Sequence, residues 1–142
     1  NSFSVGFPPT KAGYILRTCE ALREHHSGRV PHKFDELMKL AGVGPKAAHL
    51  ALQIIWRRAE GIAVDSHVHR ICNRLGWTGV SGPVKSMDTT RRKLEAWLPS
   101  NYWMEVHPML VGFGQGRCFE IAPRCADCPL MLRGLCDGVL GQ

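Results

Sequence analysis

The sequence predicts an all-α protein, and three observations support that prediction. Apolar residues recur at helical spacing along most of the chain, Gly and Pro stand where these segments should begin and end, and almost no stretch alternates as a β-strand would. The 142 residues fit one domain by length, and no apolar run approaches the roughly 20 residues that cross a bilayer. We therefore expect a helical globular protein with no membrane partner.

Three helices are expected in the first part of the chain. Thr10 can cap the first, which ends near Gly28, and a short second helix follows Pro31. Gly42 ends the second helix, and Pro45 suits the first position of a third, where its missing N–H costs nothing. Apolar positions at helical spacing are Ile15, Leu16, Cys19 and Leu22 in the first helix and Phe34, Leu37 and Leu40 in the second, and the third should bury Ala47, Leu50, Ala51, Ile54 and Ile55.

Three more helices are expected in the second part, at residues 65–75, 88–98 and 102–113. Gly76 stops the first of them, residues 79–83 form a loop, and Pro108 should kink the last helix or begin a new one. In the helix at 65–75, the residues that share one apolar face are Val68, Ile71, Cys72 and Leu75.

The charge of the chain points to a polyanionic partner. Eighteen Lys and Arg residues against twelve Asp and Glu residues give a net charge of +6, which favours nucleic acid among such partners. The chain begins with Asn1 and shows no signal-peptide pattern, so we expect it to be part of a longer protein.

The joint between the second and third helices is a candidate phosphate site. It is so short that only glycines should let the backbone turn, at Gly42 and Gly44 on either side of Val43. Exposed N–H groups at such a turn and at the following helix start attract phosphate without reading sequence. The structural alternative is a plain tight turn between two packed helices.

Lys46 and Asp65 are candidate catalytic residues. Lys46 stands in the first turn of the third helix, where a cation is disfavoured by about 0.3 to 1 kcal/mol and the neutral, nucleophilic amine is favoured. Asp65 lies nineteen positions further on at another helix start, where capping alone explains Asp65 and Ser66. The functional interpretation requires both side chains to face one groove. His67 and His69 are interpreted as hydrogen-bonded packing residues.

Four cysteines near the carboxyl end suggest a thiolate site. The intervals between them are six, two and seven residues, and zinc, an iron-sulfur cluster and two disulfides all remain open. Zinc usually takes two close pairs, whereas a cluster tolerates uneven spacing. Cys19 and Cys72 are interpreted as buried hydrophobic residues. The four candidate ligands are Cys118, Cys125, Cys128 and Cys136, and three cations among them could clamp phosphate: Arg117, Arg124 and Arg133.

Three ordered motifs resemble the endonuclease III family of DNA glycosylases, closest to its eukaryotic branch. They read LAGVGPKAAHL at 40–50, IAVDSHVHR at 62–70 and LVGFG at 110–114. The resemblance implies a helix-hairpin-helix DNA glycosylase fold: a partial six-helix domain at 1–98, with the helix-hairpin-helix at about 33–58 and an Asp loop at 61–76. Residues 99–142 would then be a helical segment followed by a loop domain that holds a [4Fe-4S] cluster, with zinc as the second choice.

The resemblance also implies an activity. Lys46 would attack C1′ of the sugar of an oxidised pyrimidine and form a Schiff base that undergoes β-elimination, with Asp65 assisting. The DNA-contacting residues would be Gly42, Val43, Gly44, Lys46, Arg117, Arg124 and Arg133, and the cluster ligands would be the four cysteines. The expected partner is double-stranded DNA with damaged bases or abasic sites, bound by a monomeric enzyme in the nucleus, the mitochondrion or both.

The chain departs from the family pattern at three points. Ala41 replaces the usual proline of the hairpin, the last cysteine interval is seven residues where five is usual, and the family's early helices are not in the chain. The last departure leaves two explanations: the early helices belong to a part of the protein that lies outside this chain, or the chain is a non-catalytic remnant of the fold that binds nucleic acid, for example RNA within a large ribonucleoprotein assembly.

Overall fold

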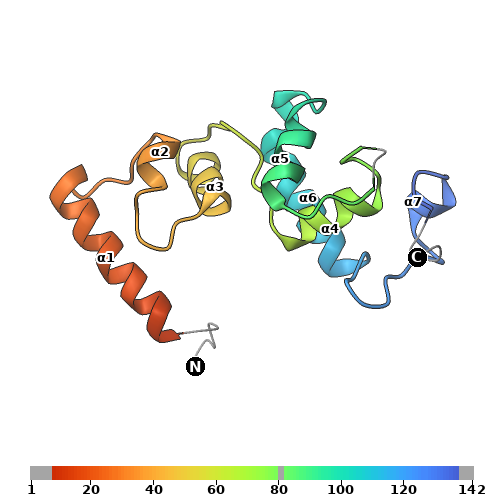
Figure 1. The fold of residues 1–142 in the computed structure, drawn as a ribbon, viewed down its shortest axis with the longest axis horizontal. Helices are drawn as coiled ribbons and strands as arrows, with labels where there is room; N and C mark the ends of the chain where they lie inside the picture. The colour runs from red at the N-terminus through yellow and green to blue at the C-terminus, as the bar shows by residue number, and fades with distance from the viewer. Residues whose placement is uncertain (1–7, 80–81, 138–142) are drawn as a thin grey trace. The chain divides into compact units, whose positions relative to one another are not determined.

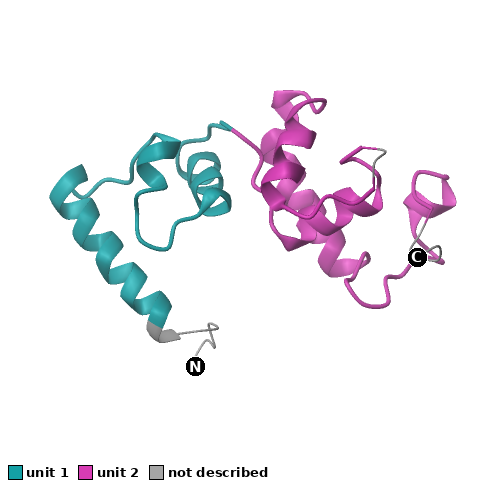
Figure 2. Cartoon of the chain, in the orientation of Figure 1, with its two compact units in different colours: residues 1–60 teal, residues 61–142 magenta. Residues whose placement is uncertain are grey.

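The structure is a computed structural model that describes residues 8–79 and 82–137, and within these ranges the regular elements are all helices (Figure 1). The prediction of an all-α fold is therefore confirmed for the described part of the chain. The chain forms two compact units, Asn1–Glu60 and Gly61–Gln142 (Figure 2). None of the described helices combines the length and the apolar character needed to span a membrane.

Unit 1 contains α1 (Pro8–His26), α2 (Phe34–Leu37) and α3 (Pro45–Ile55). The stop signal of α1 is confirmed, because Gly28 takes a left-handed conformation with φ at 73° and its N–H donates to the carbonyl oxygen of Leu22 at 2.9 Å. The start of α3 is also as expected, with Pro45 at its first position after Gly44.

The core of unit 1 lies between α2 and α3, and it corrects the predicted burial of α3. Ala47, Ile54 and Ile55 are exposed, while Leu50 and Ala51 are only half-buried. The prediction chose the face of α3 that carries the most apolar residues. In the structure a different face is buried, because it packs against α2. The Phe34 ring of α2 lies 4.5 Å from the His49 ring of α3. The buried residues of α3 are Ala48, His49, Leu52 and Gln53, and those of the rest of this core are Leu37 and Leu40.

The predicted burial of Cys19 is wrong. Cys19 is exposed on α1, as are Ile15 and Leu16, whose residue surfaces are 63% and 65% accessible. Among the described residues of α1, the apolar side chains that pack against the core of unit 1 are Ala21 and Leu22. Helical spacing therefore predicted that these residues share one helix, but it did not predict which of them are buried by other elements.

Unit 2 contains α4 (Ser66–Arg74), α5 (Met87–Glu95), the 3-10 helix η1 (Ser100–Tyr102), α6 (Trp103–Gly116) and α7 (Pro129–Leu132). Gly76 ends the first of these as predicted, with φ at 67°. Helix α6 continues through Pro108, so no new helix begins there, and α7 was not expected. In the loop predicted at 79–83, residues 79, 82 and 83 are not helical, and residues 80–81 lie outside the described residues.

The core of unit 2 is built where α4 packs against α6 (Figure 1). Gly114 of α6 permits this contact, because a Cβ atom there would lie 2.7 Å from Nδ1 of His67 and 3.1 Å from Ile71. The burial predicted for Cys72 is confirmed, and burial raises the pKa of its thiol to about 12. The core residues are Ile62, Val64, Val68, Ile71, Cys72, Leu94, Val106 and Leu110. They come from both sides of residue 98, and the domain boundary expected there stays a prediction.

Gly114→Ala should destabilise the protein. The added methyl group would overlap His67 and force α6 away from α4, and overpacking of this kind costs about 1 to 3 kcal/mol. Gly112→Ala is the matched control, because nothing lies within 4 Å of a Cβ at Gly112 of the same helix, and alanine there should stabilise by up to about 1 kcal/mol. Urea unfolding of both variants measures the difference, and equal stability of the two would contradict the close contact at Gly114.

Candidate active site and cysteine cavity

The hairpin at residues 40–45 ends in a helix start that carries no side-chain cap. Position 42 requires glycine for two reasons: its φ is 74°, and a Cβ atom there would lie 2.7 Å from the Tyr14 ring. Gly44 differs from expectation: its backbone is extended, with φ at −99° and ψ at 179°, and the space around it is open. Gly44 is therefore not needed to turn the chain, and its lack of a side chain leaves the start of α3 approachable.

Lys46 is exposed in the first turn of α3, and no acidic residue shares that turn. The free N–H groups that begin any helix make this end electropositive, so the surroundings of Lys46 favour anions. Lys46 belongs to unit 1 and Asp65 to unit 2. The common groove expected between them stays a prediction.

Asp65 caps α4, and its two carboxylate oxygens have different neighbours. Oδ1 accepts a hydrogen bond from the backbone N–H of Val68 at 2.9 Å, which confirms the capping interpretation. Oδ2 lies 3.5 Å from Nε2 of His107 on α6, and both side chains are largely buried, with exposures of 14% and 13%. The carboxylate is therefore held in one direction by the start of one helix and the side of another. His107 was not singled out from the sequence, because nothing in its local pattern marks it.

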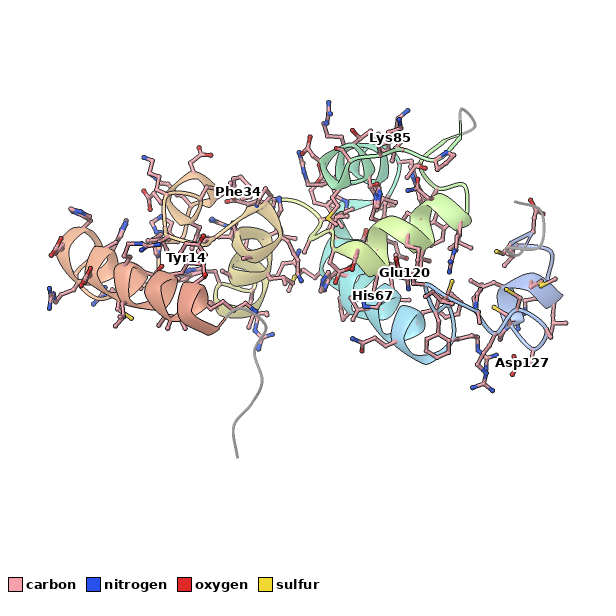
Figure 3. All side chains as sticks on the ribbon, turned by 60° about the horizontal axis from the view of Figure 1, so that its bottom comes forward. Tyr14, Phe34, His67, Lys85, Glu120 and Asp127 are labelled. Atoms are coloured by element: carbon pink, nitrogen blue, oxygen red, sulfur yellow. The ribbon has the colours of Figure 1, made fainter. Side chains whose placement is uncertain are left out.

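His67 and His69 are packing residues, as predicted. Nδ1 of His69 lies 2.7 Å from Oγ1 of Thr90, and Nδ1 of His67 lies 3.2 Å from the guanidinium group of Arg70. His67, labelled in Figure 3, is also the residue that approaches Gly114 most closely. These contacts give both rings structural partners within unit 2.

All four predicted cysteine ligands line one cavity of unit 2. The cavity holds about 20 Å³ of free volume, and Arg74, Leu75, Phe113 and Arg117 also line it. No disulfide joins any of the described cysteines, so the alternative of two disulfides is not realised. The ligand candidates that share the cavity are Cys118, Cys125, Cys128 and Cys136.

Zinc and a [4Fe-4S] cluster place different demands on the four cysteines. Among the residues with described positions, no three Cys, His, Asp or Glu side chains lie close enough together to hold a single metal ion. Zinc needs its sulfurs at about 2.3 Å from one centre, whereas each iron of a [4Fe-4S] cluster takes one thiolate, so the thiolates surround a larger body. Which of the two groups the four cysteines hold stays a prediction.

Arg70 and Arg74 of α4 hold the segment that begins at the first of these cysteines. Arg70 donates to the carbonyl oxygen of Cys118 at 2.7 Å, and Arg74 donates to those of Phe119 and Glu120 at 2.6 and 2.9 Å. Neither arginine was singled out from the sequence. Their spacing of four residues, which places both on one face of a helix, is the signal that was available.

Two of the three arginines expected to contact DNA pair with one carboxylate. Arg117 lies 2.8 Å and Arg124 lies 3.5 Å from the Asp127 side chain, which is labelled in Figure 3. The hydrogen bond from Arg117 lowers the pKa of Asp127. Arg133 is exposed just after α7. Contact of these arginines with phosphate stays a prediction.

A helical hairpin that leads into an uncapped helix, an aspartate that caps the next helix and a cavity lined by four cysteines define a helix-hairpin-helix protein with a candidate thiolate site. The family model of the HhH-GPD superfamily base excision DNA repair proteins matches residues 2–100. The chain therefore belongs to this superfamily and, within it, to the endonuclease III family.

Named relatives come from animals and plants. Endonuclease III-like protein 1 of Bos taurus is 48% identical over 139 residues, which cover 98% of this chain and 44% of the relative. Endonuclease III homolog 1, chloroplastic, of Arabidopsis thaliana is 45% identical over 129 residues, which cover 89% of this chain and 34% of the relative. The chain thus spans less than half the length of these curated relatives.

A solved structure supports the fold. The structure described as a trapped endonuclease III-DNA covalent intermediate, in an estranged-adenine complex, is 34% identical with a TM-score of 0.84. The match covers 94% of this chain and 60% of that one. The helix-hairpin-helix fold expected from the sequence is confirmed at this level.

Asp65→Asn should leave the free energy of unfolding nearly unchanged, whereas Asp65→Ala should lower it. Asparagine retains an oxygen that can accept from the N–H of Val68, so its cost should be small, whereas alanine removes the cap at about 1 kcal/mol. Ser86→Ala is the matched control, because the Ser86 hydroxyl caps α5 by accepting from the N–H of Thr89 at 3.1 Å. Loss of this cap should lower the stability by a similar amount. Urea unfolding compares the three variants, and an Asn variant as unstable as the Ala variant would refute the capping role.

Proposed function

We propose that this protein is a DNA glycosylase with lyase activity at abasic sites, which removes oxidised pyrimidines from double-stranded DNA. The observation that carries the proposal is Lys46, exposed in the first turn of α3 directly after the hairpin. Family membership and the likeness to a trapped covalent complex of an endonuclease III with DNA support it. Removal of the base and cleavage of the backbone would proceed through one covalent intermediate.

In the proposed mechanism, Lys46 is the nucleophile. Its amine, after losing a proton, attacks C1′ of the deoxyribose, and the bond between C1′ and the base nitrogen breaks, so that the base leaves with the bonding electrons. The sugar ring then opens to a Schiff base on Nζ. Loss of a proton from C2′ breaks the bond between C3′ and the phosphate oxygen, and water finally releases the lysine.

Asp65 assists this reaction through its charge and fixed direction. As the base leaves, positive charge develops on the sugar, and a preorganised carboxylate stabilises it without having to reorient. The hydrogen bond from Val68 and the contact with His107 support such a role, because they limit the directions that the carboxylate can take. Asp65 can also accept the amine proton once DNA excludes water.

The hairpin and the net charge would bind the DNA. The uncapped N–H groups at the start of α3, beside the open space at Gly44, suit a phosphate group. A net charge of +6 adds attraction that does not depend on sequence. Flipping of the target nucleotide costs a few kcal/mol and costs least for a damaged base, which contributes to selectivity.

The four cysteines would hold a [4Fe-4S] cluster, and zinc is the second choice. Their shared cavity supports the cluster, which would order the loop that carries Arg117, Arg124 and Arg133. Unmodified thiolates suit a reducing compartment. We place the protein in the nucleus, the mitochondrion or both, as a monomer.

Lys46→Gln should abolish the covalent adduct that borohydride traps on DNA with an abasic site. Glutamine has no amine to form the Schiff base, so no reduced adduct can accumulate. Binding should persist, with a salt dependence lower by about one phosphate contact. Denaturing gel electrophoresis after borohydride treatment measures the adduct. Lys85→Gln, which removes the same charge from an exposed position in unit 2, should still be trapped.

Two results of this experiment would reject the proposal. An adduct that survives in Lys46→Gln would assign the nucleophile to another residue. No adduct with the unsubstituted, iron-loaded protein, combined with salt-sensitive binding that Lys46→Gln leaves unchanged, would favour the alternative of a non-catalytic nucleic-acid-binding protein, whether it binds DNA or RNA.

Cys128→Ser should remove the bound iron and its visible charge-transfer absorbance. Cys128 is the most buried of the four ligand candidates, and serine is a poor ligand for iron in a cluster. Cys19→Ser is the control, because Cys19 is exposed in unit 1 and should leave the iron content unchanged. Metal analysis per chain measures both. One zinc ion per chain in the unsubstituted protein, without iron, would show that the four cysteines hold zinc and not a cluster.

A further inference from the structure

Arg74, the last residue of α4, makes a contact that the proposed reaction does not require. Its Nη1 donates to the Sγ atom of Cys118 at 3.4 Å. The same guanidinium group donates to the carbonyl oxygens of Phe119 and Glu120 at 2.6 and 2.9 Å. Three acceptors therefore fix its orientation, and Arg74 also lines the cavity that the four cysteines share.

The other arginines close to this cysteine make different contacts. Arg70 donates to the carbonyl oxygen of Cys118 at 2.7 Å, and Arg117, which lines the same cavity, donates to the carbonyl oxygen of Asp127 at 2.9 Å. Arg74 thus differs from Arg70 and Arg117 in that it donates to a candidate ligand sulfur. Its effect on that sulfur should be separable from a general effect of positive charge.

A cation that donates to a cluster ligand affects the two oxidation states unequally. When a cluster accepts an electron, part of the added negative charge spreads onto the thiolate sulfurs, so each sulfur becomes a better hydrogen-bond acceptor. A fixed N–H donor with a positive charge therefore stabilises the reduced state more than the oxidised state. Hydrogen bonds to the sulfurs and the local charge are among the factors that set reduction potentials of clusters.

We propose that Arg74 raises the reduction potential of the cluster by donating a hydrogen bond to the Cys118 thiolate. This role rests on the cluster assigned to the four cysteines under the proposed function. The electron comes from an external donor, an electrode in the experiment, and Arg74 itself is neither oxidised nor reduced. Arg74 is a positioning residue that acts through Cys118 and does not touch DNA in this role.

The test compares reduction potentials of the purified, iron-loaded protein and its variants by voltammetry on an electrode without DNA. Arg74→Gln should shift the potential to a more negative value, with about a tenfold change in the ratio of reduced to oxidised cluster, which corresponds to about 59 mV for one electron. Arg74→Lys keeps the charge but loses the planar fork, and its shift should be smaller and in the same direction. Arg117→Gln is the control for charge at the same cavity and should shift the potential less than Arg74→Gln.

Iron content is measured first, because Arg74 also holds the backbone after Cys118. Where Arg74→Gln retains iron, an unchanged potential overturns the proposal, as does an equal shift in Arg117→Gln. Where Arg74→Gln loses iron, the potential of Arg74→Lys is measured instead, and an unchanged potential in that variant overturns the proposal. Loss of iron from both variants would assign Arg74 to building the site and would also overturn the tuning role.

The failures of the two proposals are distinguishable. No iron in the unsubstituted protein rejects the cluster of the proposed function, whereas full iron with a potential insensitive to Arg74 rejects the further inference alone. Borohydride trapping on DNA depends on Lys46 and reports on the catalytic proposal without reference to the potential.

Discussion

The close packing of α4 against α6 is the constraint on which unit 2 depends. It exists because Gly114 has no side chain where His67 passes, and it brings Val68, Ile71 and Cys72 into the core. Helix α4 has nine residues and spans about 13 Å at the usual rise of about 1.5 Å per residue. Asp65 stands at its first end and Arg74 at its last, so a single rigid element fixes both the candidate carboxylate and the wall of the cysteine cavity.

Local signals in the sequence predicted the features that local chemistry decides. Asp65 caps α4 because a short acceptor before an apolar helical segment satisfies the first N–H groups, and this rule needs no knowledge of the rest of the fold. Pro45 and Gly76 mark a start and a stop for equally local reasons. The four cysteines line one cavity, in keeping with their closeness in the sequence, and their role as ligands stays a prediction.

Features decided by contacts between elements could not be predicted in the same way. In α3 the inward face carries His49 and Gln53 while Ile54 and Ile55 are exposed, because α2 and Phe34 determine which side is covered. Nothing in the local sequence distinguishes Arg70 and Arg74 from surface cations. Both donate to backbone carbonyl groups in a segment more than forty residues further on. Their spacing of four residues places both on one helix face, but it does not indicate which segment that face contacts.

The geometry of Asp65 also constrains which catalytic role suits it. One oxygen accepts from the backbone of α4 and the other faces His107, so the group cannot swing to follow a moving proton without giving up the cap. A carboxylate held in this way is suited to a charge that appears in one place, such as the positive charge on a sugar whose base is leaving. The interaction that stabilises the helix is then the same one that preorganises the site. Electrostatic stabilisation of the sugar is therefore the main role that this geometry supports for Asp65, and acceptance of the amine proton is secondary to it.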